Sequence, residues 1–227
     1  MRELEMCGGT MPYPPRHVGL IPDGMRRWAR ANSTSLEDSY RTGAAKIADF
    51  VTALAAENCG EVTIFGLSRA NLARPTNELD PLYGAALTLL GEALPEVLSE
   101  VDSQFRLIGD RSSLPAGCRD AAERLEKRHD RGWFRVNVLA AYDPAQELRD
   151  AFARSCELGT PFESALEVPD VDIVIRTSPE KLLSGFLPYQ SRNALLHFSD
   201  IPLNDLSVDD FLHVVKTLAS IEPLRGR

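Results

Sequence analysis

Short apolar runs alternate along this chain with longer segments of helical period, and this alternation constrains the fold more than any other feature. The pattern is typical of an α/β domain with a mainly parallel central sheet flanked by helices. The apolar runs predict strands over residues 17–22, 61–67, 104–109, 134–141, 171–176 and, more weakly, 195–198. A length of 227 residues suits one large domain, so we expect a single domain over residues 16–227.

Several of the intervening segments carry helix signals. Residues 35–38 (Ser-Leu-Glu-Asp) form a capping box, which predicts a helix that ends near Gly60. The next predicted helix, residues 80–101, has an apolar face wider than a surface helix requires, which indicates either core packing or the wall of an apolar tunnel. Further helices are predicted over residues 115–129, 144–157 and 207–221.

Charge and composition exclude several classes of protein. A net charge of -8 argues against a nucleic-acid partner, because phosphate-backbone binding needs a face rich in Lys and Arg. No apolar run is long enough to span a bilayer, so we expect no stable membrane insertion. Residues 1–15 lack the basic and apolar blocks of a signal peptide, so we expect a flexible N-terminal segment and a cytoplasmic protein. The four cysteines show no metal-ligand spacing and are expected to be thiols.

Charged residues directly follow three of the predicted strands. Asp23 and a basic cluster that includes Arg26 and Arg27 follow the first strand, Arg74 lies after the second, and Arg176 ends the fifth. Guanidinium groups bind phosphate oxygens in bidentate fashion, so these positions indicate a phosphorylated substrate. A carboxylate beside them suits Mg²⁺, which often combines one or two carboxylates with substrate phosphates. The alternative interpretation is an ordinary turn at Asp23 and solvated ion pairs.

Four segments resemble motifs of the cis-prenyltransferases, the undecaprenyl diphosphate synthase family. Residues 17–29 (HVGLIPDGMRRWA) resemble the family's opening motif, HxxxIMDGNxRWA. Residues 65–75 are similar to YAFSxENWxRP, residues 106–110 to RxIGD, and residues 172–190 to DLxIRTxGE followed by SNFLxWQ. The matches occur in family order, from about residue 17 to the predicted C-terminal helix.

This resemblance implies a Mg²⁺-dependent enzyme with an apolar substrate tunnel, usually a homodimer. Asp23 would hold Mg²⁺ on an allylic diphosphate, and the oxygens of that diphosphate would bind the next residues of the motif and one later arginine: Gly24, Met25, Arg26, Arg27 and Arg74. Tyr40 stands where the family has a histidine near the donor phosphate. Ser68 and Asn71 match residues that position the second substrate and assist proton removal, and Arg176 and Ser184 match groups that bind its diphosphate.

The sequence departs from the family motifs at several positions, and two of these, Leu182 and Leu195, concern the second substrate. Met25 replaces an asparagine, Leu182 stands in place of a phosphate-binding arginine, and Leu195 in place of a metal-binding glutamate. The loss of one cation and one acid leaves the local charge unchanged, so a diphosphate could bind there differently. His197 could supply a replacement cation or proton acceptor, because its ordinary pKa lies near neutrality.

The first motif also resembles the irregular branch of the family, which makes lavandulyl-type products by head-to-middle coupling. We therefore expect dimethylallyl and geranyl diphosphate to be joined into a branched, isosesquilavandulyl-like diphosphate. One alternative is an ordinary short-chain cis-prenyltransferase that uses isopentenyl diphosphate. A non-catalytic partner subunit is less favoured, because Asp23 is retained.

Overall fold

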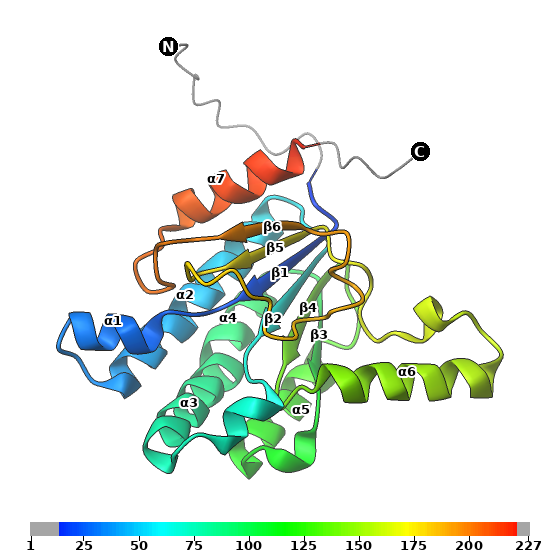
Figure 1. Cartoon of the computed structure of the whole chain (residues 1–227), viewed down its shortest axis with the longest axis horizontal. Coiled ribbons are helices and arrows are strands. Elements are labelled where there is room, and N and C mark those ends of the chain that lie inside the picture. The colour runs from blue at the N-terminus through cyan, green and yellow to red at the C-terminus, as the bar shows by residue number, and fades with distance from the viewer. Residues whose placement is uncertain (1–13, 222–227) are drawn as a thin grey trace.

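Six parallel strands form one sheet at the centre of the molecule, in the order β3-β4-β2-β1-β5-β6 (Figure 1). The computed structural model describes residues 14–221, so most of the predicted flexible segment 1–15 lies outside the described residues. The strands are β1 His17–Ile21, β2 Glu61–Phe65, β3 Ser103–Ile108, β4 Phe134–Leu139, β5 Ile173–Arg176 and β6 Leu195–Phe198. All the predicted strands are confirmed, and the mainly parallel sheet is parallel throughout its described pairings.

The helices follow the predicted order with two corrections. They are α1 Met25–Ala31, α2 Leu36–Ala56, α3 Thr76–Thr88, α4 Leu94–Ser99, α5 Ala116–Arg128, α6 Pro144–Leu158 and α7 Val208–Ala219. The predicted helix over residues 80–101 begins earlier, at Thr76, and is divided by a π-helical turn at Leu89–Ala93 (η2). Helix α1 was not predicted, because Ala29 is its one buried residue and seven residues show too little apolar period.

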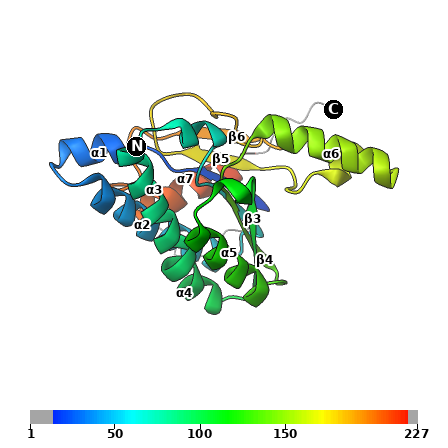
Figure 2. The ribbon, with the colours of Figure 1, turned by 90° about the horizontal axis from the view of Figure 1, so that it is seen from below.

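The two faces of the sheet are covered differently. Helices α2, α3, α4, α5 and α7 pack on one face, and on α2 the ring of Phe50 stacks on Phe211 of α7 at a centroid distance of 4.1 Å. The other face is covered by segments without long helices, including Val168, Val171, Phe186 and Leu187. Figure 2 shows α6 projecting away from the other helices. Burial of each large apolar side chain stabilises such a core by about 1.5–3 kcal/mol.

The structure also describes three of the four cysteines and the length and apolar character of the helices. Cys59 and Cys118 are buried and Cys156 is exposed, all three as free thiols, while Cys7 lies outside the described residues. Within residues 14–221, no helix combines the length and the apolar character needed to cross a membrane.

Candidate active site

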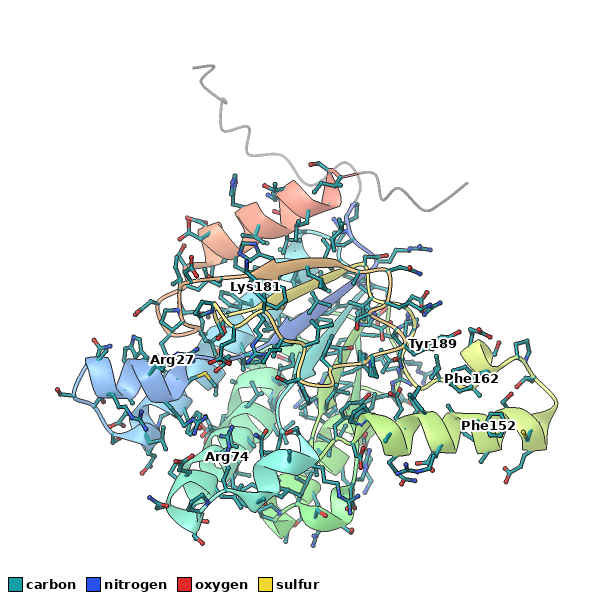
Figure 3. The ribbon with its side chains drawn as sticks, in the orientation of Figure 1. Arg27, Arg74, Phe152, Phe162, Lys181 and Tyr189 are labelled. Atoms are coloured by element: carbon teal, nitrogen blue, oxygen red, sulfur yellow. The ribbon has the colours of Figure 1, made fainter. Side chains whose placement is uncertain are left out.

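A polar hollow lies beyond the carboxyl ends of β1, β2 and β5. Strand β1 lies between β2 and β5. From β1, the strands β2 to β4 are added on one side and β5 and β6 on the other, so the strand order reverses at β1. Open parallel sheets bind ligands at such a switch point. The hollow has a volume of about 830 Å³, part of it open to solvent, and the predicted site residues that line it are Asp23, Met25, Arg26, Arg27, Tyr40, Ser68, Asn71, Arg74, Arg176 and Ser184. In Figure 3, Arg27 and Arg74 lie at the same end of the molecule.

Asp23 is fixed by backbone contacts directly after β1. Its N–H donates to Oγ1 of Thr177 at 2.8 Å, and the Thr177 hydroxyl donates to the carbonyl oxygen of Asp23 at 2.9 Å. The N–H of Gly24 donates to Oδ1 of Asp23 at 2.6 Å. Gly24 has a φ of 97°, and a Cβ there would lie 2.7 Å from Cβ of Pro202. Gly24 therefore holds the carboxylate in place, although it does not itself line the hollow.

Two arginines and two carboxylates form a closed ring of charges in the hollow. Nη2 of Arg176 lies 2.8 Å from Oδ2 of Asp23 and 3.1 Å from Oε2 of Glu180. Arg27 lies 3.0 Å from Oε1 of Glu180 and 3.8 Å from Oδ1 of Asp23. Sequence reasoning did not assign Glu180 a role, although it follows Arg176 by four residues and lines the same hollow.

The ring sets the charge of Asp23. Burial by itself would raise the pKa of the Asp23 carboxyl, but the hydrogen bonds from Arg176 and from the N–H of Gly24, with the nearby charges, hold this pKa below its ordinary value. Asp23 is therefore a carboxylate at neutral pH and accepts protons weakly.

Ser68 and Asn71 cap each other at the start of a short 3₁₀ helix, η1 (Arg69–Ala73). The N–H of Ser68 donates to Oδ1 of Asn71 at 3.0 Å, and the N–H of Asn71 donates to Oγ of Ser68 at 3.2 Å. Each side-chain oxygen thus already accepts a backbone hydrogen bond. The Ser68 hydroxyl and the Asn71 amide nitrogen can still donate, which suits them to bind a phosphate oxygen.

An apolar hollow of about 730 Å³, part of it open to solvent, adjoins the polar one. Residues shared by the two hollows are Pro22, Met25, Tyr40, Gly66 and Leu82. Its wall includes the apolar face of the helix predicted over residues 80–101: Leu82, Ala85, Ala86, Leu89 and Leu90. The tunnel-wall interpretation of that face therefore agrees with the structure.

Tyr40 lies where the two hollows join. Its hydroxyl accepts a hydrogen bond from Nη1 of Arg74 at 3.4 Å. Burial raises the pKa of the Tyr40 hydroxyl, so this group stays neutral and can still donate to an anion.

The structure also places the two leucines that the motifs put near the second substrate, Leu182 and Leu195, and the histidine suggested as a replacement, His197. Leu195 begins β6 and lines a separate hollow with Arg16 and Leu218. Leu182 is 61% exposed and does not line the polar hollow, although its carbonyl oxygen accepts a hydrogen bond from Arg176. Among the described residues that line the polar hollow, neither Leu195 nor His197 occurs.

The oxygen ligands of the site suit a magnesium ion only together with oxygen ligands from a substrate. Within residues 14–221, no group of three His, Cys, Asp or Glu side chains could hold a metal by itself. Asp23 nevertheless offers a hard oxygen beside the arginines, with 31% of its side chain exposed. Mg²⁺ commonly takes one or two carboxylates and completes its shell with phosphate oxygens and water. The arrangement thus suits a diphosphate ester with an apolar tail.

Comparisons with known proteins agree with this chemistry. Residues 21–223 match the family model described as "Putative undecaprenyl diphosphate synthase". The chain is 32% identical to isoprenyl transferase 1 of Streptomyces avermitilis, over 91% of this chain and 86% of that protein. It is 33% identical to a (2Z,6E)-farnesyl diphosphate synthase of Mycolicibacterium smegmatis, over 89% and 84% of the two chains.

A solved structure shares the fold. Lavandulyl diphosphate synthase from Lavandula x intermedia, in complex with dimethylallyl diphosphate, superposes with a TM-score of 0.85 at 24% identity, over 92% of this chain and 97% of that one. At this identity the likeness concerns the fold alone.

Proposed function

This chain is a prenyltransferase of the undecaprenyl diphosphate synthase family, and we propose that it joins dimethylallyl and geranyl diphosphate head-to-middle into a branched, isosesquilavandulyl-like diphosphate. The observation that carries the proposal is the junction of an arginine-lined hollow with an apolar one. The first can hold diphosphate groups and the second a prenyl chain.

On the donor side, Arg26, Arg27 and Arg74 would bind the diphosphate of the allylic substrate, with a further hydrogen bond from Tyr40. The allylic C–O bond breaks, and its electron pair leaves with the diphosphate. Arginines aimed at that group stabilise the charge that develops on it. Mg²⁺, held by Asp23 and the diphosphate, would neutralise further negative charge on the leaving group when bound.

On the acceptor side, Arg176 and Ser184 would hold the second diphosphate, and Ser68 and Asn71 would orient it. The acceptor double bond supplies the electron pair of the new C–C bond, and one proton is then lost. Because Asp23 is a weak base and the oxygens of Ser68 and Asn71 already accept hydrogen bonds, we assign the proton to the released diphosphate.

The head-to-middle outcome rests on how the acceptor is anchored. Within the described part of the chain, the acceptor side has Arg176 but an exposed leucine, Leu182, where the family has a second arginine. A diphosphate anchored at a shifted position brings a different carbon of the acceptor double bond to the allylic cation. Met25, at the junction of the hollows, adds an apolar contact where the family has an asparagine.

A second candidate is an ordinary short-chain cis-prenyltransferase that adds isopentenyl diphosphate. It is favoured by the 33% identity to the (2Z,6E)-farnesyl diphosphate synthase. Both candidates use the same donor chemistry and differ in the acceptor.

A competition assay tests the proposal. Purified enzyme receives geranyl diphosphate and Mg²⁺ with equal concentrations of isopentenyl and dimethylallyl diphosphate, and products are identified by mass spectrometry and NMR. We expect a branched head-to-middle C15 skeleton as the main product. A linear head-to-tail cis product would overturn the irregular assignment and support the second candidate.

The proposal includes the homodimer and the cytoplasmic location expected from the sequence. In support of the dimer, α6 carries the strongly exposed side chains Phe152 and Leu158. Phe162 and Tyr189 lie on the same side of the molecule as Phe152 (Figure 3), and a group of exposed and partly exposed apolar side chains suits a protein interface.

A further inference from the structure

Glu180 connects the arginine assigned to the donor with the arginine assigned to the acceptor. Its two carboxylate oxygens lie 3.0 Å from Arg27 and 3.1 Å from Arg176. The arginines that must bind two diphosphates are thus bridged by one carboxylate of the same chain.

The donor groups of Arg176 are already occupied in this arrangement. Nη1 donates to the carbonyl oxygen of Leu182 and to the hydroxyl of Ser184, and Nη2 donates to both carboxylates of the ring. The remaining donor, Nε, is buried without a hydrogen-bond partner. Arg176 can bind a diphosphate with Nη2 only if one carboxylate gives way.

The two carboxylates differ in their freedom to move. Asp23 is tied by Thr177 and by the N–H of Gly24 directly after β1. Glu180 lies between β5 and β6 in a segment without helix or strand, and half of its side chain, 51%, is exposed. Lys181, the next residue, is exposed, and in the view of Figure 3 it lies higher than Arg27. Glu180 is therefore the carboxylate that can turn toward solvent.

We propose that Glu180 acts as an internal substitute for the substrate diphosphate: it neutralises Arg27 and Arg176 in the free enzyme and is displaced when a diphosphate binds. This inference rests on the proposed roles of Arg27 and Arg176. When a diphosphate displaces Glu180 from one arginine, the ion pair between Glu180 and the other arginine weakens. Binding of the first diphosphate therefore frees the second arginine for the second diphosphate. Glu180 is thus a positioning residue that lowers the affinity for each diphosphate.

Calorimetric titration with inorganic diphosphate, with and without Mg²⁺, tests this role without turnover. The variant is Glu180→Gln, which keeps the shape of the side chain and removes its charge. We expect about two- to tenfold tighter binding than in the wild type, the range that removal of two ion pairs to a half-exposed carboxylate allows. The matched control is Glu123→Gln on α5, since Glu123 also pairs with a cation and is 55% exposed. Its diphosphate affinity should not change.

The outcomes separate this inference from the proposed function. Unchanged or weaker binding by Glu180→Gln, with normal binding by the wild type, would overturn the inference and leave the diphosphate site in place. Weaker binding only with Mg²⁺ would instead identify Glu180 as a metal ligand. A wild-type protein that binds no diphosphate, or whose binding is unaffected by Arg176→Ala, would remove the proposed function itself.

Discussion

The position and charge of Asp23 depend on three neighbouring residues, Thr177, Gly24 and Arg176. Thr177 clamps its backbone, Gly24 supplies a hydrogen bond that needs a left-handed conformation, and Arg176 pairs with its free oxygen. The carboxylate therefore stays charged and faces the arginines before any substrate arrives. Substitution of Asp23 itself should therefore change catalysis more than folding.

Asp23→Ala should reduce turnover by at least about a hundredfold, because a metal-binding carboxylate contributes several kcal/mol to transition-state stabilisation. The free energy of unfolding should change by about 1 kcal/mol or less, since Arg176 keeps Glu180 as a partner. Steady-state kinetics with Mg²⁺ and thermal unfolding measure the two effects. Asp49→Ala, at an exposed position of α2, is the control. Near-normal activity of the Asp23 variant would contradict the assigned role.

Arg176→Ala should raise KM for the acceptor about ten- to a hundredfold, since a charge-assisted hydrogen bond contributes about 1.5–3 kcal/mol. KM for the donor should rise much less. Arg176→Lys keeps the charge without the planar fork and should give an intermediate value. If the donor KM responds more strongly, the two subsites have been exchanged in our assignment.

At the scale of elements, the sequence predicts the sheet better than the short helices. Strands buried on both faces appear as continuous apolar runs, and all of the predicted strands occur within a few residues of their expected bounds. Helix α1 and the turn η1 are too short for a period to appear. The π-helical turn at Leu89–Ala93 has no signal in a pattern with a period of 3.6 residues.

The candidate site shows a similar contrast: residues that follow the strands were predicted, and a residue defined by a contact between distant segments was missed. Residues placed directly after β1, β2 and β5 meet in one hollow, because parallel strands end at the same edge of the sheet. Their roles remain predictions. Glu180 was missed because its pairing with Arg27 joins segments 153 residues apart. Leu195 lies outside the hollow because it is the first residue of β6. It therefore lies at the amino ends of the parallel strands, whereas the hollow lies beyond their carboxyl ends.

Helix α3 offers a test of the apolar hollow as the site of the prenyl chain. Ala86→Phe should fill part of that hollow, so the ratio of geranyl to dimethylallyl turnover should fall at least about threefold. The cost of overpacking is typically about 1–3 kcal/mol of stability, which thermal unfolding will measure. Leu87→Phe changes the neighbouring residue, which is 43% exposed and does not line the hollow, and should leave the ratio unchanged. An unaltered ratio in Ala86→Phe would place the chain elsewhere.

Charge and apolar surface are distributed unevenly over the protein. The chain has a net charge of -8, yet Arg26, Arg27, Arg74 and Arg176 gather around one hollow. Such a cluster attracts a small anion while the acidic remainder disfavours nucleic acid. In Figures 1 and 2, α6 projects from the sheet, and Figure 3 shows Phe152, Phe162 and Tyr189 on that side of the molecule, away from Arg27.

The exposed and partly exposed apolar side chains on and near α6 offer a test of the proposed homodimer. Phe152 is 63% exposed and Leu158 is 69% exposed on α6, and nearby the ring of Phe162 packs edge-on against Tyr189 with a centroid distance of 5.1 Å. If a second copy covers this surface, Phe152→Glu places a charge in an apolar interface and should convert dimers to monomers at micromolar concentration. Sedimentation velocity would then give a mass near 25.0 kDa for the variant and near twice that value for the wild type.

The control for the dimer prediction is Gln146→Glu, which adds the same charge at an exposed polar position of α6. It should remain dimeric, and circular dichroism should show the same helix content for both variants and the wild type. A wild-type monomer would refute the dimer. A dimeric Phe152→Glu variant would instead place the interface on another surface, because a charged side chain buried without a partner in an apolar contact costs several kcal/mol and would not leave a dimer intact at that surface.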